Sequence, residues 1–222
     1  MRKLIFCGLL ALVAAPVVAD DSDWVASSNE HAQIVLEQMA RFSPETAARL
    51  GVDGLDEEIF DLTDGVYERG INASRELLAE LRKREAAETH PKVKQDLGIL
   101  VRTIEDNITS SELNRAQMLP YYNMSQTIFF GVRGLIDPQV PRERYPAAVV
   151  RMEKYAGIAD GHEEPIVELA KARTRERFEV NGLVGPYKGE VEQDLERAET
   201  FITGIEQMLQ GTDLQGWEET YI

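Results

Sequence analysis

The sequence has little cysteine and little histidine, and these shortages exclude several kinds of catalytic site. Its single cysteine, Cys7, lies in an apolar N-terminal stretch, so the rest of the chain has no disulfide and no thiol nucleophile. None of the three histidines, His31, His90 and His162, has a glutamate three residues before it. The Glu-x-x-His pairs that hold two metal ions in helical bundles are therefore absent.

Complete motifs for zinc, serine or nucleotide chemistry are also missing. A helical zinc hydrolase needs His-Glu-x-x-His, and the stretch from His162 begins in this way but has Ile166 at the last position and Pro165 before it. There is no Gly-x-Ser-x-Gly, and the glycines Gly131 and Gly134 lack the spacing of a phosphate-binding loop. The residues of this chain therefore predict no catalytic, metal-binding or cofactor-binding site.

Basic residues are scarce relative to acidic ones. Lysine and arginine number 24 against 39 aspartates and glutamates, which gives a formal charge of -15. Loss of Arg2 and Lys3 would lower this value by two, to -17. Such a surface repels nucleic acid and anionic lipid headgroups, so we expect neither as a partner.

Long hydrophobic runs are missing except at the N-terminus. Met1, Arg2 and Lys3 precede an apolar run from Leu4 to Ala15, and small residues follow up to Ala19. This pattern predicts a signal peptide over residues 1–19, with export to a periplasm or to the outside of the cell. The run is shorter than the roughly 20 residues that span a bilayer, so we expect no membrane segment after cleavage. Residues 20–28 are acidic and without pattern, and we expect a flexible lead-in there.

Helix signals dominate the rest of the chain. Apolar residues recur at helical spacing, with no strand-like alternation and no repeat of fixed period. Capping residues, prolines and glycines predict helices over 29–42, 44–50, 64–88, 91–118, 145–156, 160–178 and 186–211. In the helix of 160–178, Pro165 should either start or kink the helix. The fold class is therefore all-α, an antiparallel bundle of about six to eight helices within a domain of residues 29–211.

The fourth and the last of the predicted helices carry a clear apolar stripe. The third and fourth should form an antiparallel hairpin, because only a short break around Pro91 separates them. The stripe of the fourth helix comprises Val93, Leu97, Leu100, Val101, Ile104 and Ile108. The stripe of the last helix comprises Val191, Leu195, Ala198, Ile202, Ile205 and Leu209.

The central stretch, residues 119–146, differs from its neighbours. It holds five aromatic residues, four prolines and two glycines, which predict an irregular segment rather than a helix. Aromatic side chains on such backbone can face a cleft or a core. Tyr121, Tyr122, Phe129 and Phe130 can each take either role, with core packing as the alternative to a cleft. Tyr121, Tyr122 and Phe129 are the candidate contacts to a substrate. Residues 212–222 hold Trp217 and Tyr221 and predict a tail truncated from a longer protein.

Several short motifs, spread over residues 29–210, resemble the N-terminal part of a bacterial family catalogued as domain of unknown function 885. The motifs are Phe42-Ser43-Pro44-Glu45-Thr46-Ala47-Ala48-Arg49-Leu50-Gly51, Asp96-Leu97-Gly98-Ile99-Leu100, Leu119-Pro120, Arg151-Met152-Glu153-Lys154-Tyr155, and Gly182 to Pro186 leading into Val191. The resemblance implies a helical zinc metallopeptidase in which two walls of helices flank a cleft. It places the zinc ligands downstream of the matched region, so no catalytic residue transfers to this chain, and zinc is implied only for a full-length family member.

Two functional hypotheses follow. In the first, the chain is the N-terminal helical wall of a zinc-metallopeptidase-like protein, contacts a peptide substrate, and is inactive without a C-terminal catalytic half. In the second, it is a self-contained secreted helical binding module for a peptide or an apolar ligand. The first predicts an exposed apolar patch where the second half would pack, and the second predicts a closed surface.

Overall fold

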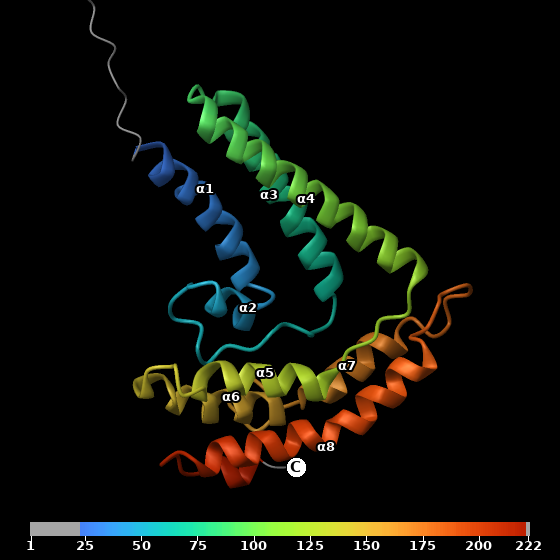
Figure 1. Ribbon diagram of the computed structural model, residues 1–222. Helices are drawn as coiled ribbons and strands as arrows, with labels where there is room; N and C mark the ends of the chain where they lie inside the picture. The colour runs from blue at the N-terminus through green and yellow to red at the C-terminus, as the bar shows by residue number, and fades with distance from the viewer. Residues whose placement is uncertain (1–22, 221–222) are drawn as a thin grey trace, which may run out of the picture.

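The computed structural model describes residues 23–220, and helices joined by loops make up this part of the chain (Figure 1). It contains eight α-helices and no β-sheet, which confirms the all-α prediction. They are α1 (Asp23–Ala40), α2 (Pro44–Arg49), α3 (Val66–Ala87), α4 (Pro91–Gln117), α5 (Met124–Ile136), α6 (Pro146–Ala156), α7 (Ile166–Arg175) and α8 (Lys188–Gln210). Two short 3-10 helices, η1 (Arg142–Arg144) and η2 (Trp217–Thr220), complete the structure. The predicted signal peptide lies outside the described residues.

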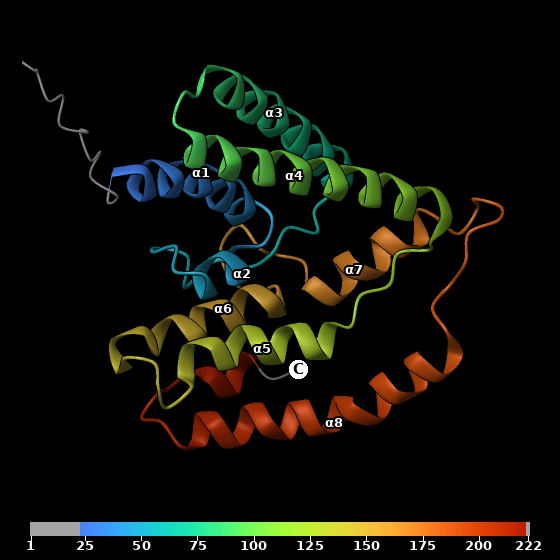
Figure 2. The ribbon, with the colours of Figure 1, turned by 45° about the horizontal axis from the view of Figure 1, so that its top comes forward.

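One layer of the fold consists of α1, α3 and α4. The two long helices form the predicted antiparallel hairpin, and α1 packs against both (Figures 1 and 2). Their facing stripes bury Leu77, Leu81, Val93, Leu97, Val101 and Ile104. The stripe predicted for 91–118 is therefore confirmed in its buried positions, and it makes the first hydrophobic core.

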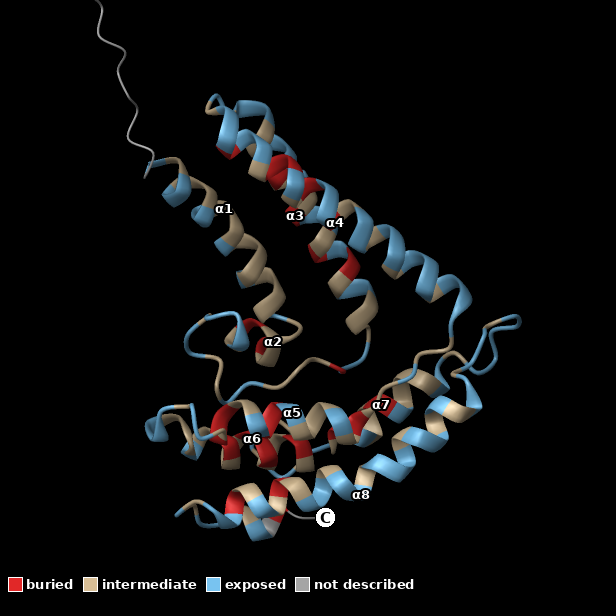
Figure 3. Ribbon diagram, in the orientation of Figure 1, coloured by how far each residue is buried: buried red, intermediate tan, exposed pale blue. Residues whose placement is uncertain are grey.

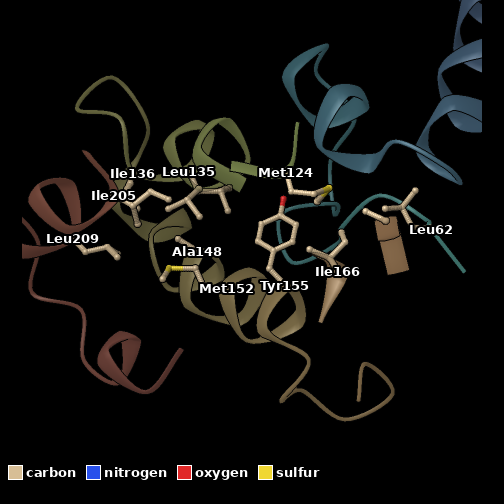
Figure 4. Packing of buried hydrophobic residues seen from close by; sticks show 12 residues of the cluster. Leu62, Met124, Leu135, Ile136, Ala148, Met152, Tyr155, Ile166, Ile205 and Leu209 are labelled. Atoms are coloured by element: carbon tan, nitrogen blue, oxygen red, sulfur yellow. The ribbon is translucent and has the colours of Figure 1, made fainter. Parts of the chain in front are cut away.

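The second layer consists of α5, α6, α7 and α8, and it has a separate core. Figure 3 shows most of the buried residues in two groups, one on the α3–α4 hairpin and one on α5 to α8, with a few more on α2. The second core includes Val132, Leu135, Ile136, Met152, Ile205 and Leu209, several of which are seen in Figure 4. The short helix α2 and the loop 50–65 lie between the two layers (Figure 1).

The central stretch is not irregular throughout, and this part of the prediction is wrong. Residues Met124–Ile136 form α5, because Pro120 and Pro138 lie outside this span. The Asn123 side chain accepts a hydrogen bond from the Gln126 amide at 3.0 Å and so caps the new helix. Within the central stretch, residues 119–123 and the turn that follows Ile136 are non-helical, and the short helix η1 follows that turn.

Two other helix starts differ from the prediction. Helix α1 begins at Asp23, so residues 23–28 are helical and not a flexible lead-in. Helix α7 begins at Ile166, because Gly157 ends α6 with a φ of 75° and Pro165 precedes the next helical residue. Residues 158–165 therefore form a connection, and of the two roles predicted for Pro165 it takes the first, since the helix starts directly after it.

The last helix buries only part of its stripe. Ile205 and Leu209 belong to the second core, whereas Leu195, almost three turns before Ile205, is 67% exposed. The expected truncated tail is folded in its described part, since η2 lies against α6 and Trp217 packs on the second core. None of the helices in residues 23–220 combines the length and the apolar character that a membrane crossing requires.

Candidate functional site

Two adjoining pockets lie where the two layers meet. Pocket A has a volume of about 460 Å³ and is lined by Ser43, Glu45, Thr46, Arg49, Phe60, Tyr121, Tyr122, Asn123, Gln126, Thr127, Phe130 and Gly131. Pocket B has a volume of about 410 Å³ and is lined by Phe42, Ser43, Phe60, Asp61, Leu62, Val66, Tyr67, Gly70, Ile71, Ser74, Asn107, Ile108, Ser111 and Tyr122. Ser43, Phe60 and Tyr122 contribute to both pockets, so the pockets share a wall.

Tyr122 forms part of the shared wall, as a candidate cleft residue should. Its side chain also packs against the second core. Burial raises the pKa of its phenol, although Arg115 and Arg173 act in the opposite direction. Tyr122 is therefore a neutral aromatic group that both pockets can use.

Tyr121, the second candidate, lines pocket A and is held by a hydrogen bond. Its hydroxyl donates to Asp194 Oδ2 of α8 at 2.8 Å. Burial, and then this bond, raise the pKa of Tyr121 to about 12. The bond fixes the ring at the pocket and connects the segment before α5 to α8.

Phe129, the third candidate, does not line either pocket. Its ring lies 5.0 Å from that of Phe201 on α8, centroid to centroid, and it packs on the second core. The next residue, Phe130, lines pocket A instead. The prediction for Phe129 placed it in irregular backbone, whereas on a helix the two neighbours point about 100° apart and only one can face the pocket.

Glu45 of α2 is the polar residue of pocket A with the best-defined surroundings. Its Oε1 accepts hydrogen bonds from the Phe60 amide at 3.0 Å and from the Tyr155 hydroxyl at 2.8 Å. Tyr155 lies in the core of α5, α6 and α7, with its hydroxyl pointing away from α6 (Figure 4). Burial, and then the Glu45 charge, raise the pKa of Tyr155 well above its ordinary value, so it remains a donor.

A buried arginine, Arg151, links the elements that surround Tyr155 and Glu45. Arg151 of α6 is 2% exposed and donates to the carbonyl oxygens of Gly131 at 2.8 Å and of Leu55 at 2.9 Å. Burial lowers the pKa of its guanidinium, while the nearby Tyr155 and Glu45 raise it. Arg151 thus joins α5, α6 and the loop 50–65 around the side chain of Glu45.

Ion pairs hold the loop 50–65 to α6 and its entry. Arg144 donates to both carboxylate oxygens of Asp56, at 2.6 and 2.7 Å, and Lys154 lies 3.0 Å from Glu58. The hydrogen bond from Arg144 is the main cause that lowers the pKa of Asp56. The acidic residues that the sequence places in this loop therefore fix one wall of pocket A.

The three histidines and the basic residues Lys171, Arg173, Arg175 and Arg177 line neither pocket A nor pocket B. Among residues 23–220 no three His, Cys, Asp or Glu side chains come together as metal ligands, and a guanidinium nitrogen of Arg84 lies 3.5 Å from His31 Nδ1. Arg173 pairs with Asp64 and Glu176, and Arg177 donates to the Arg115 carbonyl at 2.7 Å.

Comparison of the sequence with protein-family models, with curated proteins and with solved structures finds no match. The pocket residues Glu45 and Phe60 were not predicted from the sequence. Glu45 and Tyr155 are 110 positions apart, and no local spacing brings them together. The local sequence around Glu45 shows only that it follows Pro44, the first residue of α2.

Proposed function

We propose that the chain is the peptide-binding helical region of an exported zinc-metallopeptidase-like protein, and that pockets A and B hold part of a peptide. The observation that carries this proposal is pocket A itself, which combines aromatic rings with polar groups fixed by hydrogen bonds. A peptide offers apolar side chains to the rings of Tyr122 and Phe130 and amide groups to the polar residues. The volume of pocket A is within the range of ordinary ligand sites, about 300 to 1,000 Å³.

The shared wall favours an extended ligand over a compact one. Because Ser43, Phe60 and Tyr122 line both pockets, one peptide can place neighbouring side chains in A and B. Successive side chains of an extended peptide point to opposite sides, and two pockets separated by one aromatic wall accommodate them.

The resemblance to the zinc peptidases supports the wider part of the proposal. In that family the metal ligands lie on polypeptide downstream of the matched region, and this polypeptide is the proposed partner. Large apolar side chains around the start of α8 are well exposed, among them Phe178, Val184, Tyr187 and Leu195. We propose that the second helical wall packs on these residues, because burying them would be favourable.

A self-contained binding module is the second candidate, favoured by the way this chain alone fixes pocket A. Tyr121 is held by Asp194, and Glu45 is held by Tyr155 and the Phe60 amide. Binding of a peptide or an apolar ligand would then need no further polypeptide. The two candidates agree on the pocket and differ on whether the exposed residues near α8 have a partner.

The pocket is tested by measuring the binding of short peptides to the purified chain by calorimetry. Replacement of Tyr122 by alanine should weaken binding at least tenfold, because a buried aromatic contact is lost from both pockets. Tyr187→Ala is the matched control, since Tyr187 is 78% exposed and lines neither pocket. Equal losses in the two variants would contradict the proposed site.

The peptidase part of the proposal has its own test. The isolated chain should neither cleave peptides nor bind zinc in a stoichiometric amount. Stoichiometric zinc in the purified chain would overturn the assignment of the metal ligands to other polypeptide.

A further inference from the structure

The charges in pocket A are few and well placed. Among the described residues that line it, Glu45 provides the carboxylate and Arg49 the cation. They lie four residues apart on α2, on one face of the helix. Arg49 has its own hydrogen bond, from Nη2 to Thr46 Oγ1 at 3.3 Å.

The two oxygens of Glu45 are not equivalent. Oε1 accepts from the Phe60 amide and from the Tyr155 hydroxyl, and both donors belong to the protein interior. No described residue donates a hydrogen bond to Oε2. An ionised carboxylate has about four acceptor positions, so the carboxylate of Glu45, which lines the pocket, retains acceptor capacity.

We propose that pocket A recognises a primary ammonium group of its ligand through Glu45 Oε2. An ammonium has three donors and one positive charge, which match a fixed carboxylate better than a neutral group does. The aromatic rings of Tyr121, Tyr122 and Phe130 line the same pocket and favour a cation by their negative faces. This inference rests on the proposed peptide binding, and it names the chemical group of the peptide that pocket A recognises.

The ammonium can come from the N-terminus of a peptide or from a lysine side chain, and Arg49 favours the first source. A free N-terminus is followed directly by a carbonyl oxygen, which a guanidinium one helical turn away can bind. The ammonium of a lysine side chain is separated from any carbonyl by four methylene groups. The proposed ligand is therefore a peptide with an unblocked amino end.

The test compares three tripeptides by calorimetry with the purified chain. They are Ala-Leu-Ala with a free amino end, its N-acetylated form, and N-acetylated Ala-Lys-Ala. The free peptide should bind about tenfold more tightly than its acetylated form, as expected for one charge-assisted hydrogen bond. Equal affinity of the acetylated lysine peptide and the free peptide would overturn the N-terminus as the source.

Two variants locate the recognition at Glu45. Glu45→Gln keeps an oxygen for the Phe60 and Tyr155 donors but removes the charge, and it should abolish the tenfold preference. Glu168→Gln is the control, because Glu168 pairs with Lys171 on α7 and lines neither pocket, and it should keep the preference. A preference that persists in Glu45→Gln would overturn the proposal.

Failure of this inference differs from failure of the proposed function. If the free and acetylated peptides bind the native chain equally, the ammonium proposal is wrong and peptide binding stands. If none of the three binds, peptide binding in this pocket is contradicted as well. The comparison on the native chain needs no variant, so it decides the matter even if Glu45→Gln does not fold.

Discussion

At the scale of single residues, Gly131 allows the contact between Tyr155 and Glu45. A Cβ at position 131 would lie 2.2 Å from the Tyr155 hydroxyl oxygen, closer than any real contact. Glycine in the middle of α5 costs helix stability relative to alanine, about 1 kcal/mol. Here the missing side chain leaves the space through which a buried tyrosine reaches a carboxylate of pocket A.

Gly131→Ala should therefore destabilise the fold by about 1–3 kcal/mol, because Tyr155 must move and its hydrogen bond is lost. Gly134→Ala is the matched control on the same helix, where an added Cβ meets nothing within 4 Å. That variant should leave stability unchanged or raise it slightly. Urea denaturation of both variants measures the difference, and similar stabilities would refute the role of Gly131.

Residue patterns predicted some of this site and missed the rest for a physical reason. The pair Tyr121 and Tyr122 was found because aromatic residues after Pro120 stand at a break in the helical pattern. Phe129 and Phe130 could not be told apart, since the choice depends on the helical phase of α5. Glu45 was missed because its importance comes from Tyr155, which only the tertiary fold brings near it.

At the scale of elements, the loop 50–65 is fixed by charge. Residue 56 lies 88 positions from its partner Arg144, and the two form a paired hydrogen bond between loop and η1. Its acidic residues can be read from the sequence, but the partners of their carboxylates cannot. The loop lines pockets A and B through Phe60, so its anchoring affects the site.

Asp56→Asn should make the chain less stable at neutral pH and should have no effect in strong acid. The pKa of Asp56 is lowered in the folded state, so its contribution to stability is present above the ordinary value of about 3.9. The contribution is lost as the pH falls through the lower, folded pKa, since both states are then protonated. Denaturation of the native chain and the variant over a series of pH values measures the difference in their unfolding free energies. A difference that stays the same at every pH would contradict the prediction.

At the scale of the whole molecule, the structure has two cores rather than one. Helical periodicity was sufficient to predict the all-α class and the α3–α4 hairpin, because both depend on local spacing. It did not predict that the stripe of α8 would be buried only near its end. That outcome depends on which helices pack against α8, and chiefly α5 does so.

The two cores should respond separately to loss of packing. Leu97 and Leu135 are fully buried in the first and the second core, and replacing either by alanine should cost about 2–5 kcal/mol. Leu97→Ala should reduce amide hydrogen-exchange protection mainly in α1, α3 and α4, and Leu135→Ala mainly in α5 to α8. Equal loss of protection over all helices in both variants would show a single cooperative unit.

The exposed connection between α7 and α8 has a further consequence for how the chain could be divided. The backbone of Val184 forms hydrogen bonds with Gln117 and Leu119. Helix α8 packs on the rest of the second layer through Phe201 and Leu209. Asn181 and Gly182 precede these contacts in the chain and are exposed. Cleavage between Asn181 and Gly182 would leave two peptides that still share the second core. Produced separately, such peptides should reassemble, and their complementation would report on the integrity of that core in a living cell.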